Sequence, residues 1–390
     1  MMRSMSQLPK TQSITSAGSQ LLAAALLVFS IGLARADTLQ DGPYVLRAVD
    51  GRWHSLWIDA ESEGPRLREQ VVKEGDVVTV PAVGAFPAFE VKLRPPAQPA
   101  VNDIQIDPRT ELFVMADTHG EFEIAVQLLQ RHGIIDDRLR WSFGSGFLVV
   151  LGDMFDRGPH QTELLWLIYK LEEEASRAGG GVSVALGNHE VMVLTGDDRY
   201  LNPKYLRVTA LIGADRYASL WSERTLLGQW LRNKATVFRI GPYLCLHGGI
   251  SRELVERGLA ASTVNRIVRD ALLEQPWPAD KQTEFVMGPE GPLWYRGYFE
   301  NIARRAGSKV AESKDIELIR ERFGVQAILV GHTTVPTITS LYGGRVIAVQ
   351  VYPRRDQQTG APVMEGLLIR KGGQMFRARV DGSSEPLSAP

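Results

Sequence analysis

The sequence predicts an α/β fold with buried, mostly parallel strands, and two features beyond residue 110 support this prediction. Apolar runs of strand length alternate there with segments of helical period, such as 122–133 and 162–175, as they do in βαβ units. Five of these runs end directly before a polar residue that can bind a metal ion. With 390 residues, 44% hydrophobic and 23% charged, the chain can bury the large core that such a fold needs.

The first 36 residues are expected to be a signal peptide that is not part of the fold. Arg3 and Lys10 give a basic start without acidic residues, residues 21–34 are apolar, and residues 34–36 (ARA) fit a cleavage site. The alternative is an uncleaved membrane anchor, but the apolar run is short against the roughly 20 residues that span a bilayer. We therefore expect an exported protein without a stable membrane anchor.

Cysteine content and charge restrict the compartment and the partners. Cys245 is the only cysteine, so no internal disulfide can form, and an exported chain without disulfides is compatible with the bacterial periplasm. The net charge of −1 gives no global reason to expect nucleic acid or an anionic membrane as a partner. Binding to phosphate must then be local. No feature of the sequence indicates an oligomeric state.

Four parts are expected along the chain. After the signal peptide (1–36), residues 37–107 form a small β-rich unit with short alternating stretches, which ends in a proline-rich linker at 94–103. Residues 108–352 form the α/β domain. Residues 353–390 return to strand-like alternation, in GLLIRK and MFRARV, and form a β-rich C-terminal extension.

The polar residues after the five apolar runs form the central pattern of the sequence. The runs LFVMA, FLVVLG, VSVALG, YLCL and AILVG are followed at once by Asp117, Asp153, Asn188, His247 and His332. The carboxyl ends of strands in an open α/β sheet meet at one crevice, so these side chains can converge although they are far apart in the chain. Singly, each could be a helix cap or a structural histidine. Jointly, in DTHG, GDMFDRG, GNHE, HGG and GHT, they predict a metal site.

The types of ligand indicate the chemistry. Oxygen and nitrogen ligands without a thiolate exclude a structural zinc finger and favour Mn, Fe or Zn in a site with open positions. Two such ions, about 3.5–4 Å apart, would share a carboxylate, activate a bridging water and hold the oxygens of a phosphoryl group. Arg157 could grip phosphate in a bidentate fork, and His189 could protonate the leaving group.

In this order, the five motifs resemble those of the calcineurin-like metallophosphoesterase superfamily, of the phosphoprotein phosphatase type. The resemblance covers residues 117–333, and the stretches at 187–203 and 291–299 are most similar to bacterial Shewanella-like phosphatases. It implies an αββα sandwich, with two central sheets flanked by helices. It also implies a binuclear-metal phosphatase that hydrolyses phosphomonoesters of proteins or of small molecules. A metal-activated hydroxide would attack the phosphorus directly, so no phosphoenzyme intermediate would form.

The resemblance also implies a role for each matching position. The metal ligands would be Asp117 and His119 on the first ion, Asp153 as the bridge, and Asn188, His247 and His332 on the second. The residues that contact phosphate would be Arg157, Arg296 and Asn188. The general acid would be His189, oriented by a hydrogen bond to Asp156. The two ions would be divalent or trivalent Mn, Fe or Zn.

Two departures from the family limit what the resemblance implies. Ala116 stands where the first motif usually begins with glycine, and the Ser-Ala-Pro-Asn-Tyr stretch of the eukaryotic enzymes has no counterpart after GHT. A preference for phosphoserine or phosphothreonine therefore does not follow. A hydrolase of phosphoanhydrides or phosphodiesters, such as dinucleoside polyphosphates, is the alternative enzyme, and a non-catalytic, metal-stabilised binding protein is the third hypothesis. Residues 190–240 could form a cap beside the metals or pack as ordinary helices.

Overall fold

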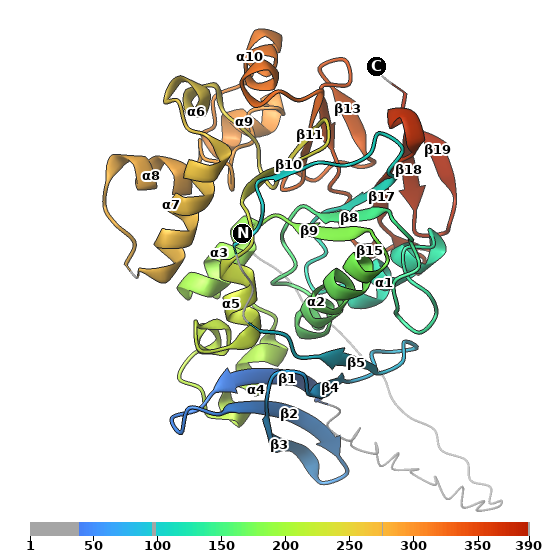
Figure 1. Cartoon of the computed structure of the whole chain (residues 1–390), viewed down its shortest axis with the longest axis vertical. Coiled ribbons are helices and arrows are strands. Elements are labelled where there is room, and N and C mark those ends of the chain that lie inside the picture. The colour runs from blue at the N-terminus through green and yellow to red at the C-terminus, as the bar shows by residue number, and fades with distance from the viewer. Residues whose placement is uncertain (1–38, 96–98, 275, 389–390) are drawn as a thin grey trace, which may run out of the picture. The chain divides into compact units, whose positions relative to one another are not determined.

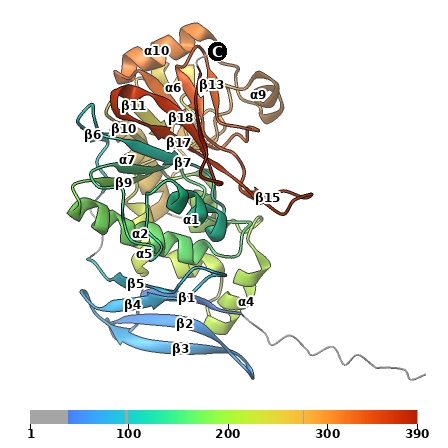
Figure 2. The ribbon, with the colours of Figure 1, turned by 90° about the vertical axis from the view of Figure 1, so that its right-hand side faces the viewer.

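Two six-stranded sheets stand at the centre of the computed structural model, which describes residues 39–95, 99–274 and 276–388 (Figures 1 and 2). The predicted signal peptide lies outside the described residues. The first sheet contains, in spatial order, β19 (Ser384–Pro386), β18 (Met375–Arg379), β17 (Glu365–Ile369), β7 (Leu112–Met115), β8 (Phe147–Val150) and β9 (Gly181–Val184). The second contains β13 (Thr339–Leu341), β14 (Val346–Ala348), β12 (Ala327–Val330), β11 (Tyr243–Leu246), β10 (Val237–Ile240) and β6 (Asp103–Ile104).

Helices cover the outer faces of both sheets, which confirms the predicted αββα sandwich. In Figure 2, α1 (Phe122–Arg131) and α2 (Gln161–Arg177) lie below the first sheet, and α10 (Ser313–Phe323) and α6 (Arg252–Glu256) lie above the second. With both faces covered, the central strands need apolar side chains in every position. All four residues of β7, β11 and β12 are accordingly buried.

The register of the parallel strands aligns the ends that carry the predicted ligands. β7, β8 and β9 are parallel neighbours, with Met115 beside Val150 and Val150 beside Val184. β11 and β12 are parallel in the other sheet, with Leu246 beside Val330. The loops after all five strands therefore leave their sheets at matched positions.

The remaining helices lie between or beside these layers. They are α3 (Asn188–Thr195), α4 (Pro203–Ile212), the 3-10 helix η1 (Tyr217–Trp221), α5 (Leu226–Arg232), α7 (Ala261–Leu273), α8 (Lys281–Met287) and α9 (Glu300–Ala306). The 190–240 segment is thus mainly helical. A short hairpin of β15 (Arg354–Arg355) and β16 (Pro362–Val363) precedes the C-terminal strands, and β17 then pairs antiparallel with β7.

The N-terminal β unit packs on the helical side of the first sheet. It consists of the antiparallel strands β1 (Asp41–Arg47), β2 (Trp53–Glu61) and β3 (Gly64–Val72) and of the pair β4 (Val77–Val80) and β5 (Phe89–Lys92). It lies against α2, α4 and α5 (Figures 1 and 2). The indole Nε1 of Trp166 in α2 donates a hydrogen bond to the carbonyl of Pro43, 2.7 Å away. This contact ties β1 to the helix that follows the GDMFDRG motif.

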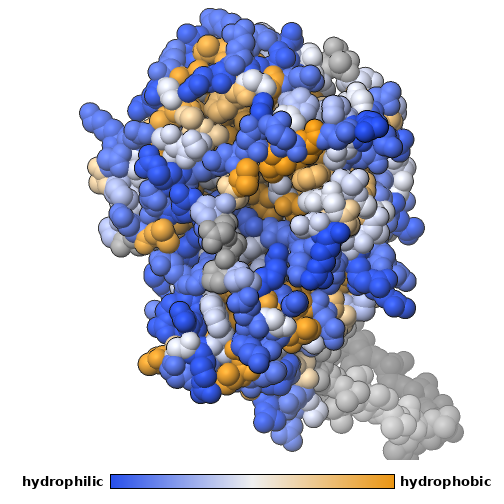
Figure 3. All heavy atoms as spheres, in the orientation of Figure 1, coloured by the Kyte–Doolittle hydropathy of each residue, from blue (hydrophilic) through white to orange (hydrophobic). Residues whose placement is uncertain are grey.

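The outer surface carries many charged side chains. On the face seen in Figure 1, hydrophilic side chains predominate and apolar ones gather in separate patches (Figure 3). Among the described residues, no helix is both long enough and apolar enough to cross a membrane.

Candidate metal centre and active site

The loops at the strand ends enclose a cavity of about 310 Å³. Three arginines and two aromatic residues share its wall with several of the predicted ligands. The lining residues are Asp117, Asp153, Arg157, Asn188, His189, Arg199, Tyr200, Trp294, Arg296, His332, Thr334 and Gln350. His119 and His247 are fully buried beside it. The structure thus brings every site residue that the sequence analysis named into one region.

The backbone turns sharply where it leaves the strands. Among the described residues, eight besides glycine have a positive φ, and six of these are predicted site residues: Asp117, His119, Asp153, Asp156, Arg157 and His332. Such a conformation costs about 1–3 kcal/mol per residue and persists only where the surroundings enforce it. The motif glycines make the turns possible, since a Cβ on Gly152 would lie 2.5 Å from the backbone nitrogen of Gly187.

Three atoms with lone pairs converge on Nε2 of His247. Its Nδ1 donates a hydrogen bond to the carbonyl of Leu151 at 2.7 Å, so Nε2 faces the centre with its lone pair. It lies 2.9 Å from Oδ1 of Asn188 and 3.1 Å from both Nδ1 of His332 and Oδ2 of Asp153.

This cluster fits a metal ion. Nε2 of His332 donates to the carbonyl of Trp294 at 3.2 Å, so its Nδ1 is also an acceptor. Ligand atoms at about 2.1 Å from one ion and at right angles to each other lie roughly 3 Å apart. Burial lowers the pKa of His247, but the carboxylates of Asp153 and Asp117 outweigh this effect and raise it to about 9, so the surroundings favour a positive charge at this place.

His119 marks the other metal position. Its Nδ1 donates to the carbonyl of Phe155 at 2.8 Å, and its buried Nε2 has no hydrogen-bond partner among the described residues. Burial lowers the pKa of His119 to about 3, so the ring is neutral and offers a lone pair. Nε2 lies 3.9 Å from Oδ2 of Asp153. Asp153 therefore belongs to both groups of potential ligands, His119–Asp153–His189 and Asp153–His247–His332, as a bridge would.

Asp117 lies at the cavity wall beside His247 and His332. It lines the cavity, and its Oδ1 accepts the backbone N–H of His332 at 3.1 Å and lies 3.9 Å from Nδ1 of His247. The three-residue group around His119 contains His189 instead.

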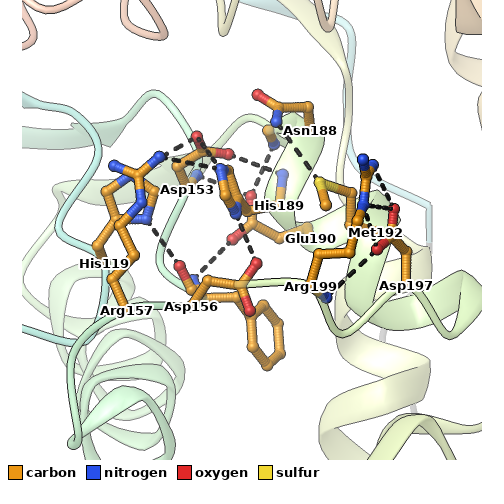
Figure 4. A network of polar contacts seen from close by, with 12 residues as sticks. His119, Asp153, Asp156, Arg157, Asn188, His189, Glu190, Met192, Asp197 and Arg199 are labelled. Atoms are coloured by element: carbon orange, nitrogen blue, oxygen red, sulfur yellow. Dashed lines mark hydrogen bonds and ion pairs between the residues drawn. The ribbon is translucent and has the colours of Figure 1, made fainter. Parts of the chain in front are cut away.

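His189 and Asp156 form a buried pair. Nδ1 of His189 lies 2.5 Å from Oδ2 of Asp156, and the backbone N–H of His189 donates to Oδ1 of Asp153 (Figure 4). Burial lowers the pKa of His189, but the hydrogen bond that its ring donates to Asp156 and the charge of Asp153 outweigh this effect and raise the pKa above its ordinary value. The raised pKa favours the protonated ring, and His189 lines the cavity.

Glu190 holds the metal-binding loop through backbone hydrogen bonds (Figure 4). Its buried carboxylate accepts N–H groups at 2.7 Å from Asp153, Met154 and Gly187, and a fourth from Phe155 at 3.3 Å. The sequence pattern gave Glu190 no role in the site. The position of Glu190 in the GNHE motif was the signal that the sequence offered for this role.

Arginines surround the mouth of the cavity. Nη1 of Arg296 donates to the carbonyl of His332 at 2.8 Å and to Oγ1 of Thr333 at 3.1 Å, which fixes the guanidinium beside the metal cluster. Arg157 is exposed, and its Nη2 lies 3.4 Å from Nε2 of His189.

Sequence analysis missed Arg199 and Tyr200. Both lie in the loop between α3 and α4 and line the cavity. Arg199 pairs with Asp197 at 2.7 Å, and the ring of Tyr200 lies 5.3 Å from that of His189. This loop of the 190–240 segment therefore contributes two side chains to the wall of the cavity. The run of polar residues in GDDRYLNP was the only hint.

Buried histidines, carboxylates and an amide, with arginines at their mouth, define a metal-dependent phosphoesterase. Residues 111–336 match the family model of calcineurin-like phosphoesterases. The match spans more than half of the chain, and the chain belongs to this family. It is a metal-dependent phosphatase, which hydrolyses phosphoester bonds.

Named relatives confirm the resemblance to Shewanella-like phosphatases. Shewanella-like protein phosphatase 2 of Arabidopsis thaliana is 25% identical over 320 residues, 71% of this chain and 79% of that one. A structure of a cold-active protein tyrosine phosphatase is 34% identical, covers 90% of this chain and 98% of its own, and has a TM-score of 0.77. That of the cold-active enzyme of a psychrophilic Shewanella species is 32% identical, covers 90% and 99%, and has a TM-score of 0.76. None of the three is named as a phosphoanhydride or phosphodiester hydrolase.

Proposed function

We propose that this phosphatase hydrolyses phosphomonoesters on tyrosine side chains of proteins. The observation that carries the substrate is the likeness, over nine-tenths of the chain, to structures whose proteins are named protein tyrosine phosphatases. The cavity supports it, because Tyr200 and Trp294 line it together with arginines. An aryl phosphate would place its ring against aromatic walls while arginine holds the dianion.

The proposed mechanism assigns one task to each side chain. Two bound ions would activate water and withdraw charge from the phosphoryl oxygens. The residues that would hold the ions are Asp117, His119, Asp153, Asn188, His247 and His332. Arg157, Arg296 and the amide of Asn188 would hold the phosphate oxygens. His189 would protonate the leaving tyrosyl oxygen, because Asp156 engages its other ring nitrogen and keeps the ring charged.

His189 could instead complete the ligand group of His119 and Asp153. We assign it to proton transfer because its Nε2 lies 3.4 Å from Nη2 of Arg157, the arginine proposed to hold phosphate. The two assignments differ in metal content: His189→Ala keeps two ions per chain under our proposal and loses one if His189 is a ligand.

A peptide panel tests the substrate. One sequence would carry phosphotyrosine, phosphoserine or phosphothreonine, beside a dinucleoside polyphosphate and bis(p-nitrophenyl) phosphate. We expect kcat/KM to be highest for phosphotyrosine by about twofold to tenfold, since an aromatic contact of this kind contributes roughly 0.5–1.5 kcal/mol beyond burial. Equal rates on all three peptides, or faster cleavage of the dinucleotide, would reject the proposed substrate.

We further propose Mn, Fe or Zn as the ions, because the ligands are imidazole, carboxylate and amide without a thiolate. Removal by a chelator, followed by addition of single metals, identifies which of them restores activity. We also propose export to the bacterial periplasm, on the strength of the sequence of residues 1–36. Cell fractionation and N-terminal sequencing should then give a periplasmic chain that begins at Asp37.

A further inference from the structure

The N-terminal β unit contacts the loop that carries Asp156 and Arg157 through a buried polar network. Arg157, with φ of 66°, and Asp156, with φ of 69°, are both in the left-handed region, so their conformation must be enforced from outside. Asn202 Nδ2 donates to the carbonyl of Arg157 at 2.7 Å, and the N–H of Arg157 donates to the carbonyl of Tyr200 at 2.9 Å. The loop before α4 thus holds Arg157 directly.

The first turn of α4 holds the next part of the same loop. Nζ of Lys204 and the hydroxyl of Tyr205 both donate to the carbonyl of Pro159, at 2.7 and 2.9 Å. The Tyr205 hydroxyl also accepts the N–H of Gln161 at 2.9 Å. The side chain of Gln161 in turn accepts the N–H of Asp156 at 2.6 Å. Tyr205 is completely buried, and the hydrogen bonds from Gln161 to Tyr205 and from Asp156 to Gln161 are buried with it.

Residues of β1 lie directly behind this turn. Asp41, completely buried, lies with its Oδ2 3.5 Å from Nζ of Lys204. The hydroxyl of Tyr44 donates to the same Oδ2 at 3.2 Å and lies 3.1 Å from Oγ1 of Thr162. Glu163 offers Lys204 a second carboxylate at 3.5 Å. A lysine between two buried carboxylates keeps its charge and one orientation.

We propose that the N-terminal β unit is a positioning element for phosphate binding: Asp41 and Tyr44 fix Lys204 and the start of α2, and the first turn of α4 then fixes the 156–161 loop. This inference rests on the proposed role of Arg157 in holding phosphate. Neither Asp41 nor Tyr44 touches the cavity, so both act on the reaction only through other residues.

Tyrosine-to-phenylalanine variants test the network with the least disturbance. Tyr205→Phe removes both hydrogen bonds of its hydroxyl to the loop, and Tyr44→Phe removes the hydroxyl that contacts Asp41 and Thr162. We expect KM for p-nitrophenyl phosphate and the inhibition constant of inorganic phosphate to rise together, about fivefold to tenfold in Tyr205→Phe and about twofold to threefold in Tyr44→Phe. The values of kcat should change less than twofold, and metal content should stay at that of the wild type.

Tyr169→Phe is the matched control. Tyr169 is also buried, lies in α2, and accepts the N–H of Arg94 at 2.9 Å, far from the loop in the hydrogen-bond network. It should leave KM and the inhibition constant unchanged. If all three variants lower the melting temperature equally but only the first two change KM, the effect is on position rather than on stability.

Arg157→Ala separates the inference from the function on which it rests. If Arg157→Ala leaves KM and phosphate inhibition unchanged, the proposed role of Arg157 is wrong. If it raises both while Tyr205→Phe and Tyr44→Phe stay at wild-type values, the positioning role is rejected and the phosphate role stands. In the double variant, Tyr205→Phe should cause no further rise in KM or in the inhibition constant beyond that of Arg157→Ala. A further rise as large as in the single variant also overturns the positioning role. A fall in kcat with loss of metal in Tyr205→Phe does so as well.

Discussion

Replacement of His189 by alanine should slow the enzyme according to the basicity of the leaving group. Proton donation by a positioned side chain contributes about 10²–10⁴-fold to a rate, or roughly 3–5 kcal/mol. The leaving oxygen of tyrosine, with a pKa of about 10, needs that proton. The leaving oxygen of p-nitrophenyl phosphate is a far weaker base and needs it much less. We therefore expect a loss of kcat of about 10²–10⁴-fold on a phosphotyrosyl peptide and of about tenfold or less on p-nitrophenyl phosphate.

The structure gives the size of the contribution from Asp156. Its carboxylate lies 2.5 Å from Nδ1 of His189, and both residues are buried. Hydrogen bonds to charged groups of this kind contribute about 1.5–3 kcal/mol. Asp156→Asn should thus lower kcat about 10-fold to 100-fold on the phosphotyrosyl peptide, and little on p-nitrophenyl phosphate. Since Asp156 acts through His189, the double variant should be no slower than His189→Ala alone.

The assay is kcat at saturating concentration of each substrate, with metal content measured on the same preparations. Two metal ions per chain in every variant ensure that a lost rate reflects lost proton transfer. Equal proportional losses on both substrates would refute the general-acid assignment, and additive losses in the double variant would refute the action of Asp156 through His189.

Four further predictions follow from the site and its supports. His119→Ala should halve the metal content measured by elemental analysis, because the unpartnered Nε2 is lost; an unchanged content would exclude His119 as a ligand. Chelation should abolish activity and lower the melting temperature, because the converging lone pairs then lose their cation; an unaffected melting curve would contradict the proposed cluster. Glu190→Gln should lower the free energy of unfolding in urea by about 1–3 kcal/mol, since an amide replaces one acceptor oxygen with a donor; no change would mean that the four backbone bonds are not needed. Burial raises the pKa of Asp41 to about 6, although the charge of Lys204 lowers it. Between pH 4 and 6, Asp41 is therefore protonated in the folded protein and ionised in the unfolded chain. The stabilisation of the folded state by this proton is complete below pH 4 and is lost as the pH rises through 6. Relative to the variant Asp41→Asn, the free energy of unfolding of the wild type should therefore fall by up to about 3 kcal/mol over this range. A difference between the two proteins that stays constant with pH would contradict the raised pKa.

The sequence predicted the strands that are buried on both faces, because such strands need unbroken apolar runs. β7, β8, β11 and β12 are of this kind. β3 (Gly64–Val72) is mostly exposed and has neither an apolar run nor a regular alternation, so its residues carried no local signal. The pairing of β17 with β7 joins residues more than 250 positions apart, which no local pattern specifies.

The candidate site was predictable where residue type alone implies chemistry. Aspartate, asparagine and histidine directly after strands indicated metal ligands without any knowledge of the tertiary structure. Arg199 and Glu190 have ordinary roles at most positions of a protein, in surface ion pairs and helix caps. Only their distances give them a function here: Arg199 lines the cavity, and Glu190 lies within hydrogen-bond reach of four N–H groups.

Backbone strain explains why residues outside the motifs should matter to this site. Ligands from two sheets can reach a common centre only if the chain reverses direction within a few residues of each strand end, and this reversal places six functional residues in the left-handed region. At about 1–3 kcal/mol each, the local cost is comparable to the whole stability of a domain, so hydrogen bonds from elsewhere must offset it. Glu190 does so for the Asp153 loop, and Tyr205 and Lys204 do so for the loop of Arg157. The β unit, which contributes no ligand, is therefore connected to the reaction through the backbone conformation that it helps to maintain.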